Sequence, residues 1–287
     1  MVVGKGAWGT AFTELLRALG HEVTLVGRAA IDEAPYEQVE LVAIAVPSRA
    51  FAEAVGHVRG DAPVLSLTKG LDPATGARLS TLVRDRPVAV LSGPNMAEEV
   101  AAGLPGATVV ASEDEAFARR LQEALNSPRF RVYVNTDLIG VELCAASKNV
   151  IALSAGGVDG LGLGDNAKAA LITRGLVEMA RLGEACGAEP ETFAGLAGMG
   201  DLIASCWHPS ARNRRAGELI ARGASPDAAR AAIGQVVEGL TTAPVLRDLS
   251  HRLGIELPIT EGVCAVLEGM PLHELLDSLM GRRPTAE

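Results

Sequence analysis

The chain has 287 residues, of which 48% are hydrophobic and 21% charged, so it can bury a core and is not a disordered tail. Aromatic residues make up only 3% and the net charge is −9, which disfavours nucleic acid as a partner, because base stacking needs aromatics and a phosphate backbone needs a basic face. We expect no integral membrane segment, because no apolar run approaches the ~20 residues of a membrane span. The 4 cysteines lie far apart, which is typical of a reducing cytoplasm.

The first half of the chain alternates short apolar runs with helical stretches. The runs are mostly Val, Leu, Ile and Ala without polar alternation, a pattern typical of strands that are covered on both faces. The predicted strands are Glu22–Val26, Leu41–Val46, Val64–Leu67, Val88–Leu91, Thr108–Ala111 and Phe130–Val134. A helix is predicted over Trp8–Leu19, ended by Gly20. This alternation predicts an α/β, Rossmann-like domain with a doubly wound, mostly parallel sheet.

From about Asp137 the strand signals nearly vanish and helical runs take over. The predicted helices are Gly140–Leu153, Asn166–Cys186, Arg212–Arg222, Pro226–Ile233, Pro244–Leu253 and Glu261–Leu267. We therefore expect two domains. Residues 1–137 would form the dinucleotide-binding domain, and residues 138–287 an all-α domain that binds substrate and carries the catalytic residues.

The chain opens with a G-x-G-x-x-G pattern, formed by Gly4, Gly6 and Gly9 after the short apolar run Met1–Val3. In a dinucleotide-binding turn, the first glycine permits the tight bend and the second lets pyrophosphate approach the backbone. The third lets the helix pack on the strand, with free amides at the helix start facing the anion. The pattern alone is weak, since any turn can be rich in glycine, but here it opens a predicted helix that leads into a strand.

Arg28 follows the end of the second strand, where an NAD site normally places a carboxylate for the ribose hydroxyl. An arginine cannot accept that hydrogen bond, but it can pair with a 2′-phosphate. The sequence therefore predicts NADP or NAD as the cofactor, with NADP favoured. The alternative is that Arg28 is a solvated loop residue.

Lys148 lies in an apolar stripe of a predicted helix, together with Val141, Cys144 and Ile151 at helical spacing. A lysine among apolar side chains is costly unless it has a function or reaches water. Desolvation beside another cation lowers the pKa of a lysine and makes it a usable acid or base. Two interpretations follow, a catalytic lysine or one whose amine extends to solvent at the rim of the helix.

Other polar candidates follow glycines or strand ends. Asp201 follows the glycine-containing stretch Gly195–Gly200, and from the residues alone a helix N-cap is its better interpretation. Arg212–Arg215 is the densest basic cluster and suits a single phosphate, with a solvated helix face as the alternative. Lys69 and the loop Gly93–Asn95 follow two predicted strands, at the edge where open α/β sheets bind ligands. The histidines show no metal spacing, and no metal site is expected.

A set of longer motifs runs in order along nearly the whole chain. They are Gly4–Ala11, Leu67–Leu71, Ser92–Pro94 with Ala97 and Glu99, Gly140–Leu143, Lys148–Val150, Asp159–Gly175, Gly198–Leu202, Arg212–Arg215 and Val236–Gly239. Together these motifs are highly specific, and the chain resembles the bacterial NAD(P)-dependent glycerol-3-phosphate dehydrogenases. The resemblance implies interconversion of dihydroxyacetone phosphate and sn-glycerol 3-phosphate, which supplies glycerol 3-phosphate for glycerophospholipid synthesis.

The resemblance also implies roles for individual residues. Lys148 matches the catalytic acid and base of the family, and Asp201 matches its carboxylate partner. The implied substrate contacts are Lys69, Gly93, Asn95, Asn149, Arg212 and Asn213. Beside the three glycines and Arg28, the implied cofactor contacts are Ala7, Trp8, Lys69, Ala97, Arg212, Val236 and Glu238.

The sequence departs from the family pattern twice. Ala211 stands where members usually carry a serine before the Arg-Asn pair, with Ser210 one place early, so one hydroxyl contact to the phosphate is in question. The segment Ala29–Glu40 is much shorter than usual, and we expect a helix or excursion to be missing there, which would open the adenosine end of the cofactor site.

Two rival functions remain open. One is a related two-domain dehydrogenase of a hydroxy acid or sugar acid, and the other a non-enzymatic NADPH sensor, although a sensor needs no proton donor such as Lys148. A homodimer is compatible with the sequence, which does not determine the oligomeric state.

Overall fold

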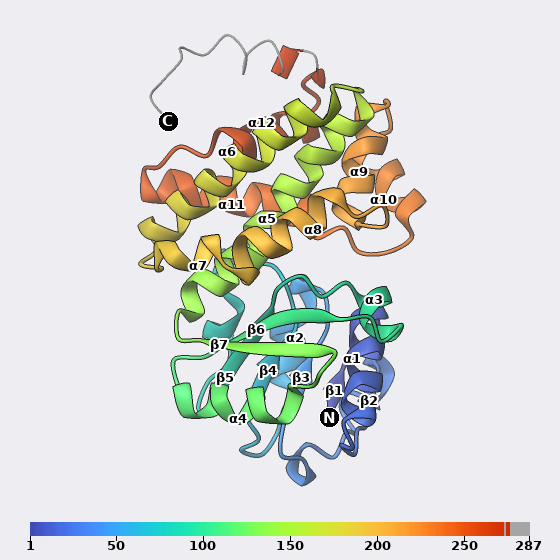
Figure 1. Ribbon diagram of the computed structural model, residues 1–287, viewed down its shortest axis with the longest axis vertical. Coiled ribbons are helices and arrows are strands. Elements are labelled where there is room, and N and C mark those ends of the chain that lie inside the picture. Colours follow the sequence, from blue (N-terminus) through green and yellow to red (C-terminus); the bar gives the residue numbers. More distant parts are fainter. Residues whose placement is uncertain (273, 276–287) are drawn as a thin grey trace.

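The structure is a computed structural model that describes residues 1–272, 274 and 275, so the end of the predicted helical half (residues 273 and 276–287) lies outside the described residues. A seven-stranded sheet forms the lower half of the molecule in Figure 1, and helices form the upper half. The strands are β1 Val2–Val3, β2 Leu25–Val26, β3 Val42–Ile44, β4 Val64–Ser66, β5 Val88–Ser92, β6 Gly106–Ala111 and β7 Phe130–Asn135.

The strand order is β2-β1-β3-β4-β5-β6-β7, and every neighbouring pair is parallel except β5 with β6. This confirms the predicted α/β, Rossmann-like sheet. The predicted strand Glu22–Val26 is wrong at its start, because only Leu25 and Val26 pair with β1. Strands β3 and β4 are fully buried, and so is β5 after its first residue, as their unbroken apolar runs indicate.

Four helices accompany the sheet. They are α1 Ala7–Ala18, α2 Phe51–Gly56, α3 Ala97–Ala101 and α4 Glu115–Leu125. The sequence analysis identified α1 but missed the other three. The start of α4 could have been predicted from Asp114, an N-cap residue whose carboxylate accepts a hydrogen bond from the Phe117 amide at 3.0 Å. Between β2 and β3 the described chain forms only two 3₁₀ turns, in agreement with the short segment noted there.

The upper half of the described structure is helical, as expected. Its helices are α5 Leu138–Gly160, α6 Gly164–Ala185, α7 Pro190–Ala194, α8 Asp201–Trp207, α9 Arg212–Ala221, α10 Pro226–Ile233, α11 Glu238–Leu253 and α12 Pro258–Leu267. A π-helical turn over Leu196–Gly200 joins α7 to α8. The prediction for α10 was correct at both ends, but α11 begins six residues before the predicted start at Pro244, which lies inside the helix.

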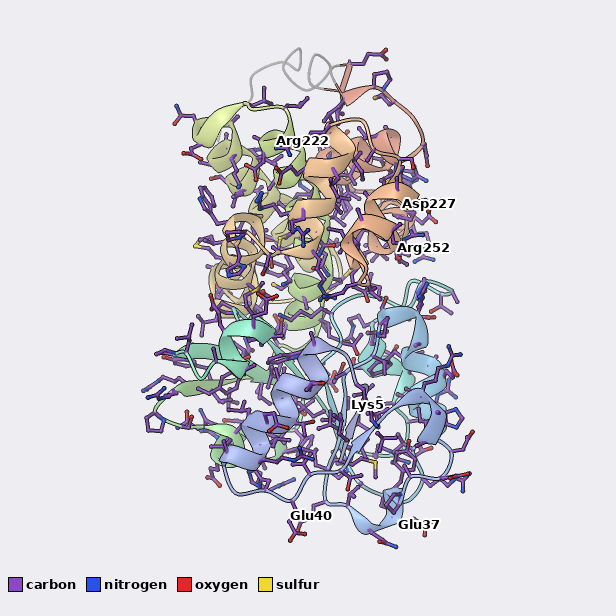
Figure 2. The ribbon with its side chains drawn as sticks, turned by 90° about the vertical axis from the view of Figure 1, so that its right-hand side faces the viewer. Lys5, Glu37, Glu40, Arg222, Asp227 and Arg252 are labelled. Atoms are coloured by element: carbon purple, nitrogen blue, oxygen red, sulfur yellow. The ribbon has the colours of Figure 1, made fainter. Side chains whose placement is uncertain are left out.

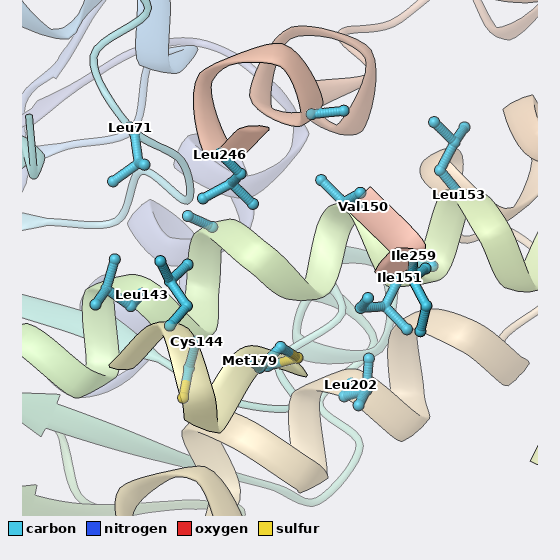
Figure 3. Packing of buried hydrophobic residues seen from close by; sticks show 14 of the residues in the cluster. Leu71, Leu143, Cys144, Val150, Ile151, Leu153, Met179, Leu202, Leu246 and Ile259 are labelled. Carbon is cyan, nitrogen blue, oxygen red and sulfur yellow. The ribbon is translucent and has the colours of Figure 1, made fainter. Parts of the chain in front are cut away.

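Helix α5 is the centre of the helical half, with α6, α8, α9, α11 and α12 packed around it (Figure 1). Figure 3 shows part of the resulting buried cluster, to which α5 contributes Leu143, Cys144, Val150, Ile151 and Leu153. By length and composition alone α5 could cross a membrane, which the sequence analysis did not anticipate. Its apolar window is 89% buried inside the protein, so its hydrophobicity serves the core.

Buried polar contacts fix the position of α5 relative to the sheet. Asp137 caps the helix, because its carboxylate accepts a hydrogen bond from the Gly140 amide at 2.8 Å. One turn later, the buried carboxylate of Glu142 accepts hydrogen bonds from the Ser80 amide at 2.8 Å and from Arg78 Nη1 at 2.9 Å. The start of α5 is therefore tied to the loop after β4, which places the polar residues of its next turns above the sheet.

The surface carries charges of both signs. On the side shown in Figure 2, exposed charged residues of both halves are labelled, namely Lys5, Glu37, Glu40, Arg222, Asp227 and Arg252. Lys5 lies in the glycine-rich turn, where its side chain runs past Gly27 at the end of β2. A cation thus stands beside the predicted adenosine end of the cofactor site.

Candidate active site

A cavity of about 510 Å³ lies between the carboxyl edge of the sheet and the helices α5, α8 and α9. This is the edge at which open α/β sheets bind ligands. Its walls include most of the predicted site residues: Gly6, Ala7, Trp8, Lys69, Asn95, Ala97, Lys148, Asn149, Asp201, Arg212, Asn213, Val236 and Glu238. The predicted residues Gly4, Gly9, Arg28 and Gly93 are not among the residues that line it.

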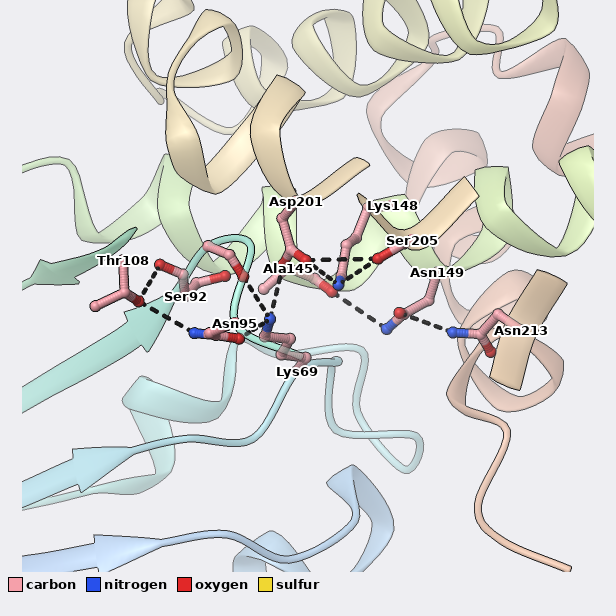
Figure 4. Close-up of polar contacts among 11 residues, drawn as sticks. Lys69, Ser92, Asn95, Thr108, Ala145, Lys148, Asn149, Asp201, Ser205 and Asn213 are labelled. Carbon is pink, nitrogen blue, oxygen red and sulfur yellow. Dashed lines mark hydrogen bonds and ion pairs between the residues drawn. The ribbon is translucent and has the colours of Figure 1, made fainter. Parts of the chain in front are cut away.

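Lys148 and Asp201 form a buried ion pair at this cavity (Figure 4). Lys148 comes from the middle of α5 and is only 5% exposed, so its amine does not extend to bulk solvent. Its Nζ donates hydrogen bonds to Asp201 Oδ1 at 2.6 Å and to Ser205 Oγ at 2.8 Å. Asp201 is the first residue of α8 and its carboxylate faces the lysine, so the N-cap interpretation of Asp201 is wrong.

A second lysine shares the same carboxylate. Lys69, from the loop after β4, donates from Nζ to Asp201 Oδ2 at 2.8 Å, to Asn95 Oδ1 at 2.9 Å and to the Gly93 carbonyl at 3.1 Å. The Asn95 amide is itself oriented, since its Nδ2 donates to Thr108 Oγ1 at 3.1 Å. The loop after β4 therefore contacts Asp201 of the helical half through Lys69, and the loop after β5 holds that lysine in place (Figure 4).

The charges of this cluster shift the pKa values of its members. Burial lowers the pKa of Lys148 to about 8, where attraction to Asp201 opposes the shift and repulsion from Lys69 adds to it. Burial alone would raise the pKa of the Asp201 carboxyl, but the two lysines outweigh burial and the net shift is downward. With a pKa of about 8, Lys148 loses its proton far more readily than an ordinary lysine, while Asp201 stays ionised beside it.

A chain of amide side chains leads from the lysine pair to α9. Asn149, next to Lys148 on α5, accepts a hydrogen bond from Asn213 Nδ2 at 2.9 Å, and the Asn213 oxygen accepts one from the Gly239 amide at 2.9 Å. Beside it, Arg212 Nη1 donates to the Val236 carbonyl at 3.1 Å. The start of α9 and the start of α11 are therefore joined at one wall of the cavity.

The glycine-rich turn has the geometry expected for pyrophosphate. Gly4 has a φ of +119°, and a Cβ there would lie 2.3 Å from the Ala45 carbonyl oxygen, so only glycine fits. A Cβ on Gly9 would lie 2.0 Å from the Gly4 oxygen, whereas one on Gly6 meets nothing within 4 Å. Gly6 opens α1 without a side-chain cap and faces the cavity, which leaves room for an anion. Close by, the buried indole Nε1 of Trp8 has no hydrogen-bond partner among the described residues.

Three of the predicted cofactor residues stand outside the lysine cluster. Both carboxylate oxygens of Glu238 are engaged by Ser48, from its amide at 3.0 Å and its hydroxyl at 2.7 Å. Arg28 has a side chain that is 87% exposed, 3.4 Å from Glu53, and does not join the cluster. Ala97 begins α3 at the rim of the cavity.

The arginines at the start of α9 do not all face the cavity. Arg212 lines the cavity, whereas Arg214 points away from it and pairs with Asp159 at 2.7 Å. Ala211 is the N-cap and offers no side-chain hydrogen bond. Ser210 lines the cavity, and its hydroxyl donates to Glu98 at 2.9 Å. The amides of the first turn of α9 are left without a side-chain cap.

Three side chains of the site were not singled out from the sequence. Ser205 stands four residues after Asp201, so helical spacing could have placed it on the same face of α8. Thr108 and Ser48 carry no local signal, because each acts on a residue from another segment of the chain.

The fold and the site together define a nicotinamide-dependent dehydrogenase with a Rossmann-like half and a helical half. Models of the N-terminal and C-terminal parts of NAD-dependent glycerol-3-phosphate dehydrogenase match residues 31–118 and 137–277. The chain belongs to the NAD-dependent glycerol-3-phosphate dehydrogenase family.

Relatives and solved structures agree with this assignment. The glycerol-3-phosphate dehydrogenase [NAD(P)+] of Symbiobacterium thermophilum is 54% identical over 79% of this chain and 68% of its own length. That of Citrobacter koseri is 42% identical over 98% of this chain and 95% of its own. The crystal structure of the Coxiella burnetii glycerol-3-phosphate dehydrogenase superposes with a TM-score of 0.92 at 37% identity and covers 98% of both chains.

Proposed function

We propose that this chain interconverts dihydroxyacetone phosphate and sn-glycerol 3-phosphate with NAD(P)H, and so supplies glycerol 3-phosphate for glycerophospholipid synthesis. The observation that carries the proposal is the buried Lys148–Asp201–Lys69 cluster in a cavity that also holds a glycine-rich turn and the start of α9. In this proposal residues 1–137 bind the dinucleotide, and residues 138–287 bind substrate and carry the proton donor.

The residues at the glycine-rich turn fit a dinucleotide. The open face of Gly6 and the free amides at the start of α1 can receive pyrophosphate. When bound, reduced nicotinamide supplies a hydride to C2 of the substrate. Val236 and Ala97 would line the dinucleotide, while Glu238 would act through the loop of Ser48 that it holds.

Lys148 supplies the proton that the reduction requires. As C2 receives the hydride, the carbonyl π electrons move to oxygen, and Lys148 Nζ donates its proton to that oxygen. In the reverse direction the neutral amine takes the hydroxyl proton, which a pKa near 8 permits. Lys69 lies on the same carboxylate and adds positive potential near the developing alkoxide. Asn95 and Gly93 hold the Lys69 ammonium in place.

The start of α9 suits the phosphate of the substrate. Arg212 and Asn213 present side-chain donors to the cavity, and the first turn of α9 adds backbone amides that no side chain caps. Asn149 links this wall to Lys148, so the phosphate would be held at a fixed distance from the proton donor. Binding the remote phosphate would therefore orient the carbonyl at C2.

A spectrophotometric assay tests the proposal. The purified chain is given dihydroxyacetone phosphate with NADH and with NADPH in parallel, and the loss of reduced cofactor is followed. Turnover of dihydroxyacetone phosphate supports the proposal. Turnover of a non-phosphorylated hydroxy acid or sugar acid instead would favour a related dehydrogenase, and NADPH binding with no turnover would favour a sensor.

The proposal also covers the cellular location and the oligomeric state of the enzyme. A cytoplasmic location is supported by the 4 cysteines, all free in the described structure. A homodimer is supported by exposed apolar side chains on the helical half, Leu161, Leu163 and Val177, which a second copy would cover. Light scattering on the purified protein measures the assembly, and a mass of one chain would contradict the homodimer.

A further inference from the structure

A second cluster of charges lies outside the cavity, at the far end of α5. Asp159, in the last turn of α5, accepts hydrogen bonds on Oδ2 from Lys168 Nζ of α6 at 2.8 Å and from Arg214 Nη1 of α9 at 2.7 Å. Lys168 is 5% exposed and its Nζ stands 4.9 Å from the ring centroid of Trp207, the last residue of α8. The carboxylate thus joins α5, α6 and α9, and Lys168 adds a contact with α8. None of these residues lines the cavity.

Both the place of Asp159 in its helix and the burial of its two cations oppose folding unless the charges are paired. A carboxylate in the last turn of a helix faces the negative end of the helix dipole, and the two cations offset this repulsion on Asp159. Lys168 and Arg214 are largely withdrawn from water, and removing Asp159 would leave the Lys168 ammonium without its carboxylate partner. Arg214 would keep an ion pair with Glu218 at 3.2 Å, but Glu218 lies on α9 itself, so that pair does not hold α9 to α5.

Arg214 connects this cluster to the cavity. It is the third residue of α9, directly after Arg212 and Asn213, which line the cavity wall. Its Nε also donates to the His208 carbonyl at 3.4 Å, so the same side chain fastens the connection from α8 to α9. The first turn of α9 is therefore held from outside by Arg214 while its inner donors face the cavity.

The packing of α9 on α5 makes this turn sensitive to small shifts. A Cβ on Gly156 of α5 would lie 1.8 Å from the Arg214 carbonyl oxygen, and one on Gly217 of α9 would lie 1.8 Å from the Leu153 carbonyl oxygen. The two backbones therefore touch, and no long side chain lies between them to absorb a displacement. This backbone contact, the hydrogen bond between Asn149 and Asn213, and the Asp159–Arg214 pair together hold α9 at its distance from Lys148 on α5.

We propose that Asp159 is a positioning residue for the substrate phosphate: through Arg214 it holds the first turn of α9 so that Arg212 and Asn213 stand at the correct distance from Lys148. The inference rests on the proposed role of α9 in binding phosphate. Asp159 does not touch the substrate and takes no part in proton transfer. Its effect is on the phosphate-bearing part of the substrate alone.

The test compares dihydroxyacetone phosphate with dihydroxyacetone, which has the carbonyl but no phosphate. Asp159→Asn should raise the KM for dihydroxyacetone phosphate about 10- to 100-fold, because a misplacement of about 1 Å can cost that much. Turnover at saturation, NADPH binding measured by fluorescence, and the kcat/KM for dihydroxyacetone should stay near wild type. Asp159→Glu keeps the charge and should recover part of the lost preference for the phosphorylated substrate.

Lys168→Gln is the matched control. This variant removes the other ion pair of Asp159 and should lower the Tm to a similar extent. Because Lys168 lies on α6 and not on α9, the preference for the phosphorylated substrate should remain. The double variant Asp159→Asn with Arg214→Gln should lose no more preference than the more impaired of its single variants, because both act through one contact.

The outcomes separate the possible failures. If Asp159→Asn and Lys168→Gln reduce turnover of both substrates alike, the cluster only stabilises the fold and the inference is overturned. If Arg212→Ala removes the preference and Asp159→Asn leaves it intact, α9 binds phosphate but Asp159 does not position it. If the wild type shows no preference for the phosphorylated substrate, the proposed function itself fails.

Discussion

Replacing Asp201 with asparagine tests whether this carboxylate keeps Lys148 protonated. The carboxylate is 1% exposed and lies 2.6 Å from Lys148 Nζ and 2.8 Å from Lys69 Nζ. A hydrogen bond to a charged group contributes ~1.5–3 kcal/mol, and one pKa unit corresponds to about 1.4 kcal/mol. Loss of the negative charge should therefore lower the pKa of Lys148 by about 1–2 units from its wild-type value of about 8. Repulsion from Lys69, no longer balanced, acts in the same direction.

The assay is the pH dependence of kcat/KM for reduction of dihydroxyacetone phosphate. Reduction requires the ammonium form of Lys148, so the rate falls as the pH rises through the pKa of this residue. We expect that fall near pH 8 in the wild type. In Asp201→Asn it should move to about pH 6–7, in line with the shift of about 1–2 units. Circular dichroism and NADPH binding establish that the variant is folded.

Ser205→Ala is the control for this experiment. It removes a neutral acceptor that lies 2.8 Å from Lys148 Nζ, so it should shift the alkaline fall in the same direction but by less than Asp201→Asn does. A folded Asp201→Asn variant whose alkaline fall stays at the wild-type pH, or moves to higher pH, would refute the reasoning. Lys148 would then not be the proton donor, or Asp201 would not tune it.

Three further substitutions address the other parts of the site. Lys148→Ala should lower kcat by about 10²–10⁴-fold while NADPH binding persists, because only the proton donor is lost; near-normal turnover would remove Lys148 from the mechanism. Arg212→Ala should raise the KM for dihydroxyacetone phosphate by about 10- to 100-fold, since a charge-assisted contact to a dianion is lost, and unchanged steady-state constants would place the phosphate elsewhere. The wild type should use NADPH at least as well as NADH, and Arg28→Asp should shift the ratio of specificity constants toward NADH. A wild type that strongly prefers NADH, or an unchanged ratio in the variant, would leave Arg28 as a surface residue.

Several features of this protein could be predicted from the sequence because short-range physics dictates them. The glycine spacing at Gly4, Gly6 and Gly9 predicted a strand-to-helix turn, and the structure leaves no room for a Cβ at Gly4 or Gly9. The apolar stripe around Lys148 predicted a lysine inside a packed helix. The unbroken apolar runs predicted a sheet with both faces covered, and helix α10 was correct at both ends because Ser225 caps its start and Gly234 ends it.

Other features were decided only by the tertiary structure. Asp201 pairs with Lys148 and Lys69, which lie 53 and 132 residues earlier in the chain, and its local glycines pointed instead to a helix cap. Likewise the basic run at the start of α9 is divided between the cavity and Asp159, a division that depends on which side of the helix faces α5. Local spacing determines helices and turns because their hydrogen bonds join near neighbours in the chain. It indicates strands only through their apolar pattern, since strand hydrogen bonds join distant segments, as where β1 pairs with β2 and β3. Which buried charges meet is determined by the packing of whole elements, since a pair far apart in sequence forms only when the fold brings both ends together.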